Sequence, residues 1–264
     1  MTGSPLLQLS SLTLGFAGNT VLDGVDFAVA AGTIASLIGP NGAGKTSLFN
    51  CITGFYKAQG GSIRFADEEM MRRKPHQVTQ AGIARTFQNV RLFRQMSVLE
   101  NVMSGMHCRT KAGAIAAILG LPSQRREEAE ILAFSEECLH FVGLTEDFHR
   151  EATTLPYGLQ RRVEIARALA SKPKLLLLDE PAAGLNTGEK QELLGLIARI
   201  RDQRGISVLL IEHDMGLVMK VSERVSVLDH GVMIAEGTVK EIQSDPKVIE
   251  AYLGQENAED DLGL

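Results

Sequence analysis

Residues 39–46 read GPNGAGKT, a run in which glycines surround a single lysine. The spacing matches the phosphate-binding pattern G-x-x-x-x-G-K-[ST], and the run lies between an expected strand and an expected helix. Glycines let the backbone curl so that successive N–H groups point at phosphate oxygens, and the start of the helix adds the positive end of its dipole. The sequence therefore predicts a nucleotide-phosphate site, in preference to a chance glycine-rich turn.

Each part of this run has an expected role. Lys45 reaches the β- and γ-phosphates, Thr46 supplies a hydroxyl for Mg²⁺, and Ser47 is placed for a further phosphate contact. The rest of the loop is expected to bind the nucleotide as well: Gly39, Pro40, Asn41, Gly42, Ala43 and Gly44. The implied cofactors are a nucleoside triphosphate and Mg²⁺.

An acidic second half of the site follows the apolar run LLLLDE at 175–180. A strand here would deliver Asp179 to the Mg²⁺ shell, and Glu180 would orient or polarise the attacking water. Alone, an apolar strand followed by two acids is equally a strand capped by a solvated turn. Its pairing with the phosphate loop favours the functional interpretation.

Three further residues stand at expected strand ends. Gln88 follows AGIARTF, and its amide suits Mg²⁺ or the attacking water; His213 follows ISVLLIE and suits the γ-phosphate. Phe16 lies in the first strand region, where its ring suits stacking on adenine. Taken separately, each is also explained by a structural role, such as backbone hydrogen bonding or core packing. No Lys-x-Asp element that could read guanine occurs, which favours ATP over GTP.

The elements that must position these residues follow from hydrophobic periodicity. Two segments alternate as antiparallel strands with one buried face do, the first with a slip at its centre: 7–16 and 25–29. Three runs are apolar throughout, as strands buried on both faces of a parallel sheet are: 33–39, 174–178 and 206–211. Helical spacing or capping sequences mark further segments: 46–53, 97–100, 124–142, 187–204 and 238–241. A hairpin turn is expected at 229–231.

Composition narrows the class of protein. The 264 residues are 44% hydrophobic and 22% charged, as in a soluble globular protein. A net charge of −5 argues against nucleic acid as the main partner. The cysteines, Cys51, Cys108 and Cys138, lack metal-ligand spacing and are interpreted as reduced thiols. No signal peptide and no run of the roughly 18–20 apolar residues that span a membrane is found, so a cytoplasmic protein is expected.

The order GPNGAGKT, Gln88, LPYGLQ, LLLLDEP and His213 resembles the nucleotide-binding subunit of an ABC transporter over nearly the whole chain. The resemblance implies an α/β fold: a RecA-like P-loop NTPase core with an antiparallel β subdomain and an inserted α-helical subdomain. It divides the chain into the first half of the core with the β subdomain, the helical subdomain ending in the signature motif, the second half of the core, and C-terminal helices with an acidic tail: 1–88, 89–157, 158–237 and 238–264.

The resemblance also assigns roles. It makes residues 39–46 the Walker A loop, Phe16 the adenine-stacking residue and Gln88 the Q-loop glutamine. Asp179 and Glu180 become the Walker B aspartate and catalytic glutamate, and His213 the switch histidine. Residues 183–186 fall on the D-loop, with Asn186 where an aspartate is more usual.

The stretch LPYGLQ, 155–160, falls on the signature motif, which usually reads LSGGQ. Leu155 and Gly158 keep their places, whereas Pro156, Tyr157 and Leu159 replace serine, glycine and glutamine. A glycine at a helix start still offers backbone N–H groups to phosphate, so Tyr157 and Gly158 are expected to bind the ATP of a partner subunit. The serine hydroxyl is lost, and whether this makes the two ATP sites unequal stays open from the sequence.

The stretches RTFQNVRLFRQMSVLENV, LLIEHDMGLVM and DPKVIEAYLG resemble the ATP-binding subunit of branched-chain amino-acid importers. This implies an ATPase motor, in a head-to-tail dimer with itself or a homologous chain, at the cytoplasmic face of the cell (inner) membrane. It would drive two integral membrane permease subunits, one coupling helix docking near 88–96, and would be served indirectly by a solute-binding protein. The apolar segment 112–122 is either a buried helix or a partner-facing patch.

Other functions remain open. Because the ATPase does not touch the transported solute, the chain could serve a urea or amide importer or a lipopolysaccharide exporter. A soluble ABC protein of DNA repair or translation is a more distant alternative. Such proteins usually show a long coiled coil, metal-hook cysteines or two fused cassettes, and this sequence shows none of them.

Overall fold

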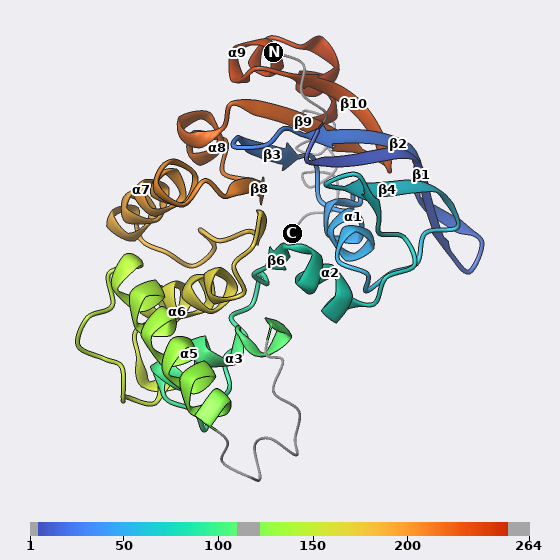
Figure 1. The fold of residues 1–264 in the computed structure, drawn as a ribbon. Coiled ribbons are helices and arrows are strands. Elements are labelled where there is room, and N and C mark those ends of the chain that lie inside the picture. Colours follow the sequence, from blue (N-terminus) through green and yellow to red (C-terminus); the bar gives the residue numbers. More distant parts are fainter. Residues whose placement is uncertain (1–4, 110–121, 253–264) are drawn as a thin grey trace.

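The computed structural model describes residues 5–109 and 122–252, and two sheets and a group of helices build it (Figure 1). The first sheet is antiparallel and has the order β2-β1-β4-β5. Its strands are β1 (Leu7–Phe16), β2 (Asn19–Val29), β4 (Gly60–Phe65) and β5 (Glu68–Glu69). The predicted slip in β1 is a bulge: Ser11 has φ 47°, and the register with β2 shifts between Leu9 and Leu12.

The second sheet has the order β10-β9-β3-β8-β7-β6. Its strands are β3 (Ile34–Ile38), β6 (Ile83–Arg85), β7 (Leu175–Asp179), β8 (Ser207–Ile211), β9 (Arg224–Asp229) and β10 (Val232–Gly237). All neighbours pair in parallel except β10, which folds back on β9 as the predicted hairpin. Every residue of β3, β7 and β8 is buried, which confirms the prediction from their apolar runs.

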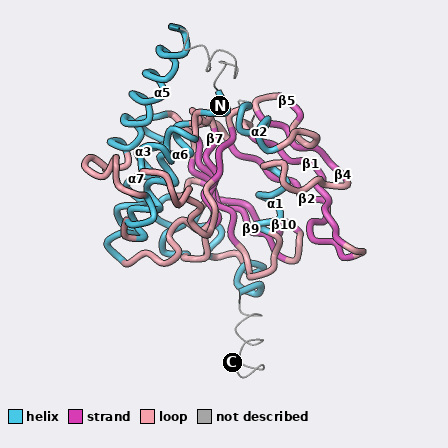
Figure 2. Tube along the Cα trace, turned by 90° about the horizontal axis from the view of Figure 1, so that it is seen from below, coloured by secondary structure: helices cyan, strands magenta, loops and turns pink. Residues whose placement is uncertain are grey.

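The six-stranded sheet lies between two hydrophobic cores. Leu175 and Leu177 of β7 pack with the antiparallel sheet and α1 (Lys45–Ile52), whereas Leu176 and Leu178 pack with helices on the other face. Those helices are α3 (Val98–Ser104), α5 (Pro122–Phe141), α6 (Tyr157–Ala170) and α7 (Thr187–Arg204). Figure 2 shows them gathered on one side of the molecule and β1, β2, β4 and β5 on the opposite side.

The capping sequences form as predicted. Ser97 and Thr238 make capping boxes with the glutamates three residues later, at the starts of α3 and α9 (Val239–Gln243). Two short helices, α2 (Pro75–Ala81) and α8 (Met215–Val221), have no counterpart in the prediction. The three cysteines are free thiols. Within the described ranges, no helix combines the length and apolar character needed to cross a bilayer. Segment 112–121 and the acidic tail lie outside the described residues.

Candidate nucleotide site

The site is built at the carboxyl ends of four neighbouring parallel strands. Across the order β3-β8-β7, Leu37 pairs with Ile211 and Ile211 with Asp179, so these strands end level with one another. β6 lies beside β7 and leads to Gln88. Because parallel strands present their carboxyl ends at one edge, this edge is where such a sheet binds ligands. Predicted residues far apart in the chain therefore meet here.

The loop after β3 is closely packed against β9 and β2. Gly39 has φ 146°, and a Cβ there would lie 1.9 Å from the carbonyl oxygen of Leu228. Gly44 has φ 104°, and its Cβ would lie 3.0 Å from the carbonyl oxygen of Val21. The N–H of Gly231 donates to the Ala43 carbonyl at 3.0 Å. Only glycine fits these turns, so the hairpin β9–β10 and the start of β2 hold the loop in shape.

Lys45 lies inside this loop. Its Nζ donates to the carbonyl oxygens of Gly39 at 2.6 Å and Pro40 at 2.8 Å, and the residue is only 9% exposed. Burial lowers the pKa of Lys45, and the nearby carboxylates of Glu180 and Asp179 partly oppose that shift. The lysine therefore faces both predicted acids from the loop side.

The other loop residues lie around it. Asn41 and Gly42 are exposed, whereas Ala43 is buried. Thr46 is exposed and Ser47 half-buried on the first turn of α1. Both hydroxyl-bearing residues thus stand beside the lysine at the start of the helix.

Asp179 has a partner that the sequence did not reveal. Its Oδ2 accepts from Nη2 of Arg85 at 2.7 Å, and the side chains are 4% and 5% exposed. Nη1 of Arg85 donates to Oδ1 of Asn50 on α1 at 2.6 Å. The ion pair joins the ends of β6 and β7, and its only signal in the sequence is a charge that ends the apolar run of β6.

The three predicted catalytic side chains meet at one carboxylate oxygen. Nε2 of Gln88 donates to Oε2 of Glu180 at 2.8 Å, and Nδ1 of His213 lies 3.8 Å from the same oxygen. Glu180 has φ 46°, a left-handed backbone, with its N–H held by the carbonyl of Ile211 at 2.9 Å. The carboxylate is thus presented between the Q-loop side and the β8 side of the site.

Glu212 is a buried acid that the sequence analysis missed. Its Oε1 accepts from the N–H of Ala182 at 2.9 Å, and the residue is 1% exposed. Burial raises the pKa of Glu212, and the hydrogen bond from Ala182 partly opposes the shift. The contact fastens the turn after Glu180 to the strand end that carries His213.

Phe16 is not a core side chain. It is 46% exposed, and its ring meets Tyr56 edge-on with centroids 5.1 Å apart. Exposure removes the core-packing alternative and leaves a ring available to a flat ligand. Tyr56, which supports it, was not predicted.

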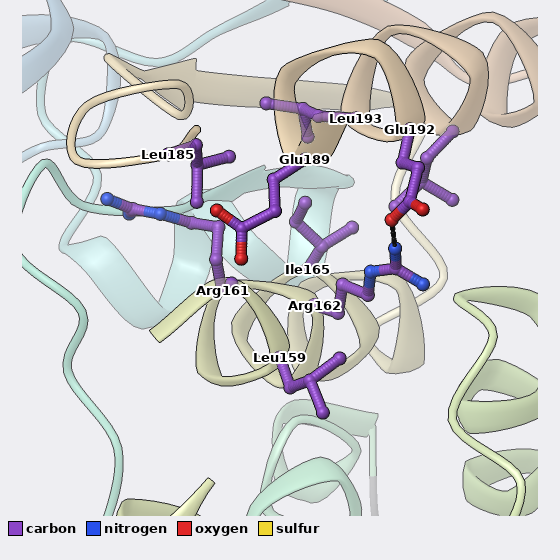
Figure 3. Close-up of a pocket in the computed structure, with 10 residues that line it drawn as sticks. Leu159, Arg161, Arg162, Ile165, Leu185, Glu189, Glu192 and Leu193 are labelled. Carbon is purple, nitrogen blue, oxygen red and sulfur yellow. Dashed lines mark hydrogen bonds and ion pairs between the residues drawn. The ribbon is translucent and has the colours of Figure 1, made fainter. Parts of the chain in front are cut away.

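Tyr157 and Gly158 are the first residues of α6, and they contact α7 and the turn 181–186. Pro156, at the N-cap, makes no side-chain cap hydrogen bond, as its type dictates. A Cβ on Gly158 would lie 2.5 Å from Oε1 of Glu189. Figure 3 shows Glu189 of α7 pointing toward α6, and beside it the ion pair of Arg162 with Glu192.

Comparisons with known proteins cover nearly the whole chain. Residues 22–183 match the ABC transporter family, and residues 232–258 match the family described as branched-chain amino acid ATP-binding cassette transporter. The high-affinity branched-chain amino acid transport ATP-binding protein BraF of Pseudomonas aeruginosa is 45% identical over 251 residues, covering 95% of this chain and 98% of that protein. LivG of Escherichia coli (strain K12), which has the same descriptive name, is 46% identical over the same shares.

Solved structures agree in fold. An ATP-binding cassette of an ABC transporter in its ADP conformation is 33% identical, with a TM-score of 0.83 over 96% of this chain and 100% of that chain. A nucleotide-free ATP-binding cassette gives a TM-score of 0.82 at 32% identity, over 94% and 98% of the two chains. The likeness therefore extends from the phosphate loop to the C-terminal strands.

Proposed function

The chain belongs to the ABC transporter ATP-binding family, and from that premise we propose that it is the ATP-hydrolysing motor subunit of an importer for branched-chain amino acids. The observation that carries the solute class is the likeness to BraF and LivG over 95% of the chain, together with the C-terminal match at 232–258. The observation that supports hydrolysis is the meeting of Gln88, Glu180 and His213 at one oxygen.

ATP binding is assigned to the loop and to Phe16. The exposed ring of Phe16 stacks on adenine. The loop 39–44 and the start of α1 direct N–H groups at the phosphates, and Ser47 adds a contact. Lys45 donates to the β- and γ-phosphates in place of its two carbonyl acceptors. The negative phosphates stabilise the ammonium form of Lys45, which burial disfavours.

The residues present fit Mg²⁺. Asp179, Thr46 and Gln88 offer carboxylate, hydroxyl and amide oxygens, the ligand types that this cation prefers. Among the described residues no group of three or more His, Cys, Asp or Glu side chains could form an all-protein cage, which agrees with a cation that keeps waters and phosphates as ligands. When bound, Mg²⁺ neutralises phosphate charge.

Hydrolysis is assigned to Glu180 and its neighbours. The carboxylate accepts a hydrogen bond from the attacking water and orients it toward the γ-phosphate. Gln88 fixes the carboxylate from one side, at 2.8 Å, and His213, whose side chain is 63% exposed, reaches the γ-phosphate from the other. The buried turn 181–182 keeps Glu180 at the end of β7.

The partners are assigned to two surfaces. Tyr157 and Gly158, at the start of α6, face the ATP of a second ATP-binding subunit in a head-to-tail dimer. A groove of about 550 Å³, lined by Phe87, Arg91, Phe93 and other residues, receives the coupling helix of a membrane permease subunit. Two permease subunits hold the motor at the cytoplasmic face of the cell membrane, and a solute-binding protein delivers the solute to them.

Uptake of labelled leucine in cells with and without this chain tests the proposal. We expect uptake to fall to background without it, to return with the native chain, and to stay at background with Lys45→Ala. Parallel uptake of labelled urea distinguishes the alternatives. Unchanged leucine uptake in the deletion, or loss of urea uptake alone, would contradict the solute class.

A further inference from the structure

Arg161 is a fully buried arginine that has no role in the proposed function. It lies on the second turn of α6 and is 1% exposed, as is Glu164 one turn later. A buried charge is costly unless it is paired and hydrogen-bonded; both terminal nitrogens of Arg161 have partners, whereas its buried Nε has none among the described residues. The position of Arg161 is therefore set by its hydrogen bonds to two other parts of the chain.

Two of these contacts hold the Q-loop backbone. Nη1 donates to the carbonyl oxygen of Phe87 and Nη2 to that of Gln88, both at 2.6 Å. Glu164 Oε2 accepts from Nη1 at 3.1 Å, and its Oε1 accepts from the N–H of Phe87 at 3.4 Å. A planar guanidinium that spans two successive carbonyls fixes both peptide units at once. The backbone at Gln88 therefore cannot shift without breaking or moving its hydrogen bond to Arg161.

A third contact reaches the start of α6. Nη2 donates to the hydroxyl of Tyr157 at 2.8 Å, with the guanidinium 5.5 Å from the centre of that ring. The ring in turn packs on the turn after the catalytic acid, since a Cβ on Gly184 would lie 3.2 Å from its Cε1. The tyrosine stands where the family usually has glycine, and its hydroxyl satisfies a buried charge.

The contacts close a ring. Gln88 donates to Glu180 at 2.8 Å; the chain runs from Glu180 to Gly184; Gly184 packs on Tyr157; and Arg161 joins Tyr157 to the carbonyl of Gln88. One side of the ring belongs to the subunit's own ATP site. The other side, Tyr157, belongs to the surface assigned to the partner's ATP site.

We infer that Arg161 is a positioning residue that couples Gln88, in the subunit's own ATP site, to Tyr157 and the helix start presented to the partner's ATP site. The inference rests on the proposed function, because only a head-to-tail dimer gives the helix start a nucleotide to bind. Movement of Gln88 toward the nucleotide then changes the position of Tyr157, and closure at one site affects the other.

A double-mutant cycle in the purified transporter complex tests this. The variants are Gln88→Ala, Tyr157→Phe and their combination, with kcat for ATP as the readout. We expect the kcat of the combination to differ by about fivefold or more from the product of the single effects, the size of coupling seen between contacting groups. Tyr157→Phe removes only the hydroxyl, so we expect the variant to fold, and its thermal unfolding temperature checks this.

Arg161 is then tested in the same complex. With Arg161→Met, we expect the two effects to multiply simply, kcat to fall by about tenfold or more, and the Kd for ATP of this chain to change by less than about threefold. Arg161→Lys restores part of kcat, since an ammonium reaches one carbonyl but cannot span two. Arg162→Met, at the neighbouring position, is the matched control. It should leave the coupling between the two substitutions, kcat and the Kd for ATP within about twofold of their parent values.

The outcomes separate the two proposals. Simple multiplication of the Gln88→Ala and Tyr157→Phe effects in the parent complex, with ATPase activity intact, overturns the coupling and leaves the proposed function standing. Equal losses of kcat, ATP binding and thermal stability with Arg161→Met overturn it as well, because they reveal a merely structural role. A parent complex that does not hydrolyse ATP overturns both.

Discussion

At the scale of single residues, the charged groups of the candidate site differ from surface charges because they are buried. Asp179 is almost inaccessible to solvent and forms an ion pair with Arg85. Burial lowers the pKa of Lys45, so its ammonium group loses a proton more readily than that of an exposed lysine. Both groups are held by partners within the chain: Arg85 for Asp179, and two loop carbonyls for Lys45. In the proposed function, a bound nucleotide and cation rearrange these contacts.

Glu212 gives a pH-dependent prediction. Burial raises its pKa above the ordinary 4.5, so the folded chain binds this proton more tightly than the unfolded chain does. The stability it contributes is present below the unfolded value and is lost as pH rises through the folded value. We expect Glu212→Gln to raise Tm at pH 7 by about 2–4 °C, the shift that ~1 kcal/mol produces in a chain of this size. Differential scanning calorimetry from pH 4 to pH 8 measures it.

The control for this prediction has the opposite sign. The pKa of Glu241, at the start of α9, is lowered by hydrogen bonds from Thr238, so its contribution is present at neutral pH and lost as pH falls. Glu241→Gln should therefore lower Tm more at pH 7 than at pH 4. A Glu212→Gln variant that loses stability as pH rises, as the parent does, would show that another group controls this range.

Residues within a motif were predictable, and their distant partners were not. Lys45 and Glu180 stand at fixed spacings from the glycines and from an apolar strand, so local pattern finds them. Arg85 lies 94 residues from Asp179, and Arg161 lies 73 residues from Gln88. Nothing local marks such pairs, because they arise only when parallel strands and α6 pack together. The assigned roles of the site residues stay predictions until they are tested.

At the scale of elements, the fully buried strands were the clearest in the sequence and the short elements the least. β3, β7 and β8 are apolar throughout because both faces are covered. β4 opens with two glycines and buries only Ile63 and Phe65, which leaves too little alternation to recognise. The seven-residue helices α2 and α8 show too few turns for a periodic pattern. The four-part division of the chain remains a prediction.

The start of α6 gives an element-scale prediction. We expect Pro156→Ser to supply the missing N-cap oxygen, stabilising the helix by ~1 kcal/mol. The hydroxyl is also expected to raise hydrolysis at the partner's ATP site by about tenfold, as a hydrogen bond to a charged group worth ~1.5 kcal/mol would. Site-resolved hydrolysis in the intact complex measures this. Pro156→Ala, which removes the ring without adding a hydroxyl, is the control, and equal rates in all three chains would show that the hydroxyl is dispensable.

At the scale of the whole molecule, the predicted fold class is confirmed. The chain shares its fold with ATP-binding cassettes at TM-scores of 0.83 and 0.82. The order of motifs sufficed for this, because each motif must follow a particular strand of the parallel sheet. The transported solute leaves no such mark in this chain, since the motor assigned here works on ATP and on its partner subunits. The proposed solute class therefore rests on the similarity to BraF and LivG.

The proposed head-to-tail dimer gives the last prediction. We expect Glu180→Gln to preserve ATP binding but to lower kcat by about 10²–10⁴-fold, the usual contribution of a general base, and so to trap a long-lived closed dimer. Size-exclusion chromatography with and without ATP, alongside the ATPase rate of the assembled transporter, measures both effects. Glu236→Gln, on an exposed strand edge, is the control. Hydrolysis at the normal rate would remove Glu180 from its assigned role.

The backbone conformation at Glu180 has a consequence for directed evolution of this protein. Its φ of 46° costs a non-glycine residue roughly 1–2 kcal/mol. Selection for thermal stability alone would favour glycine or asparagine at this position, because both residues adopt a left-handed backbone at low cost. In the proposed function, such a variant would be more stable but would no longer support solute uptake, because Glu180 is lost. Any screen for robust variants must therefore demand growth on the imported solute in every round.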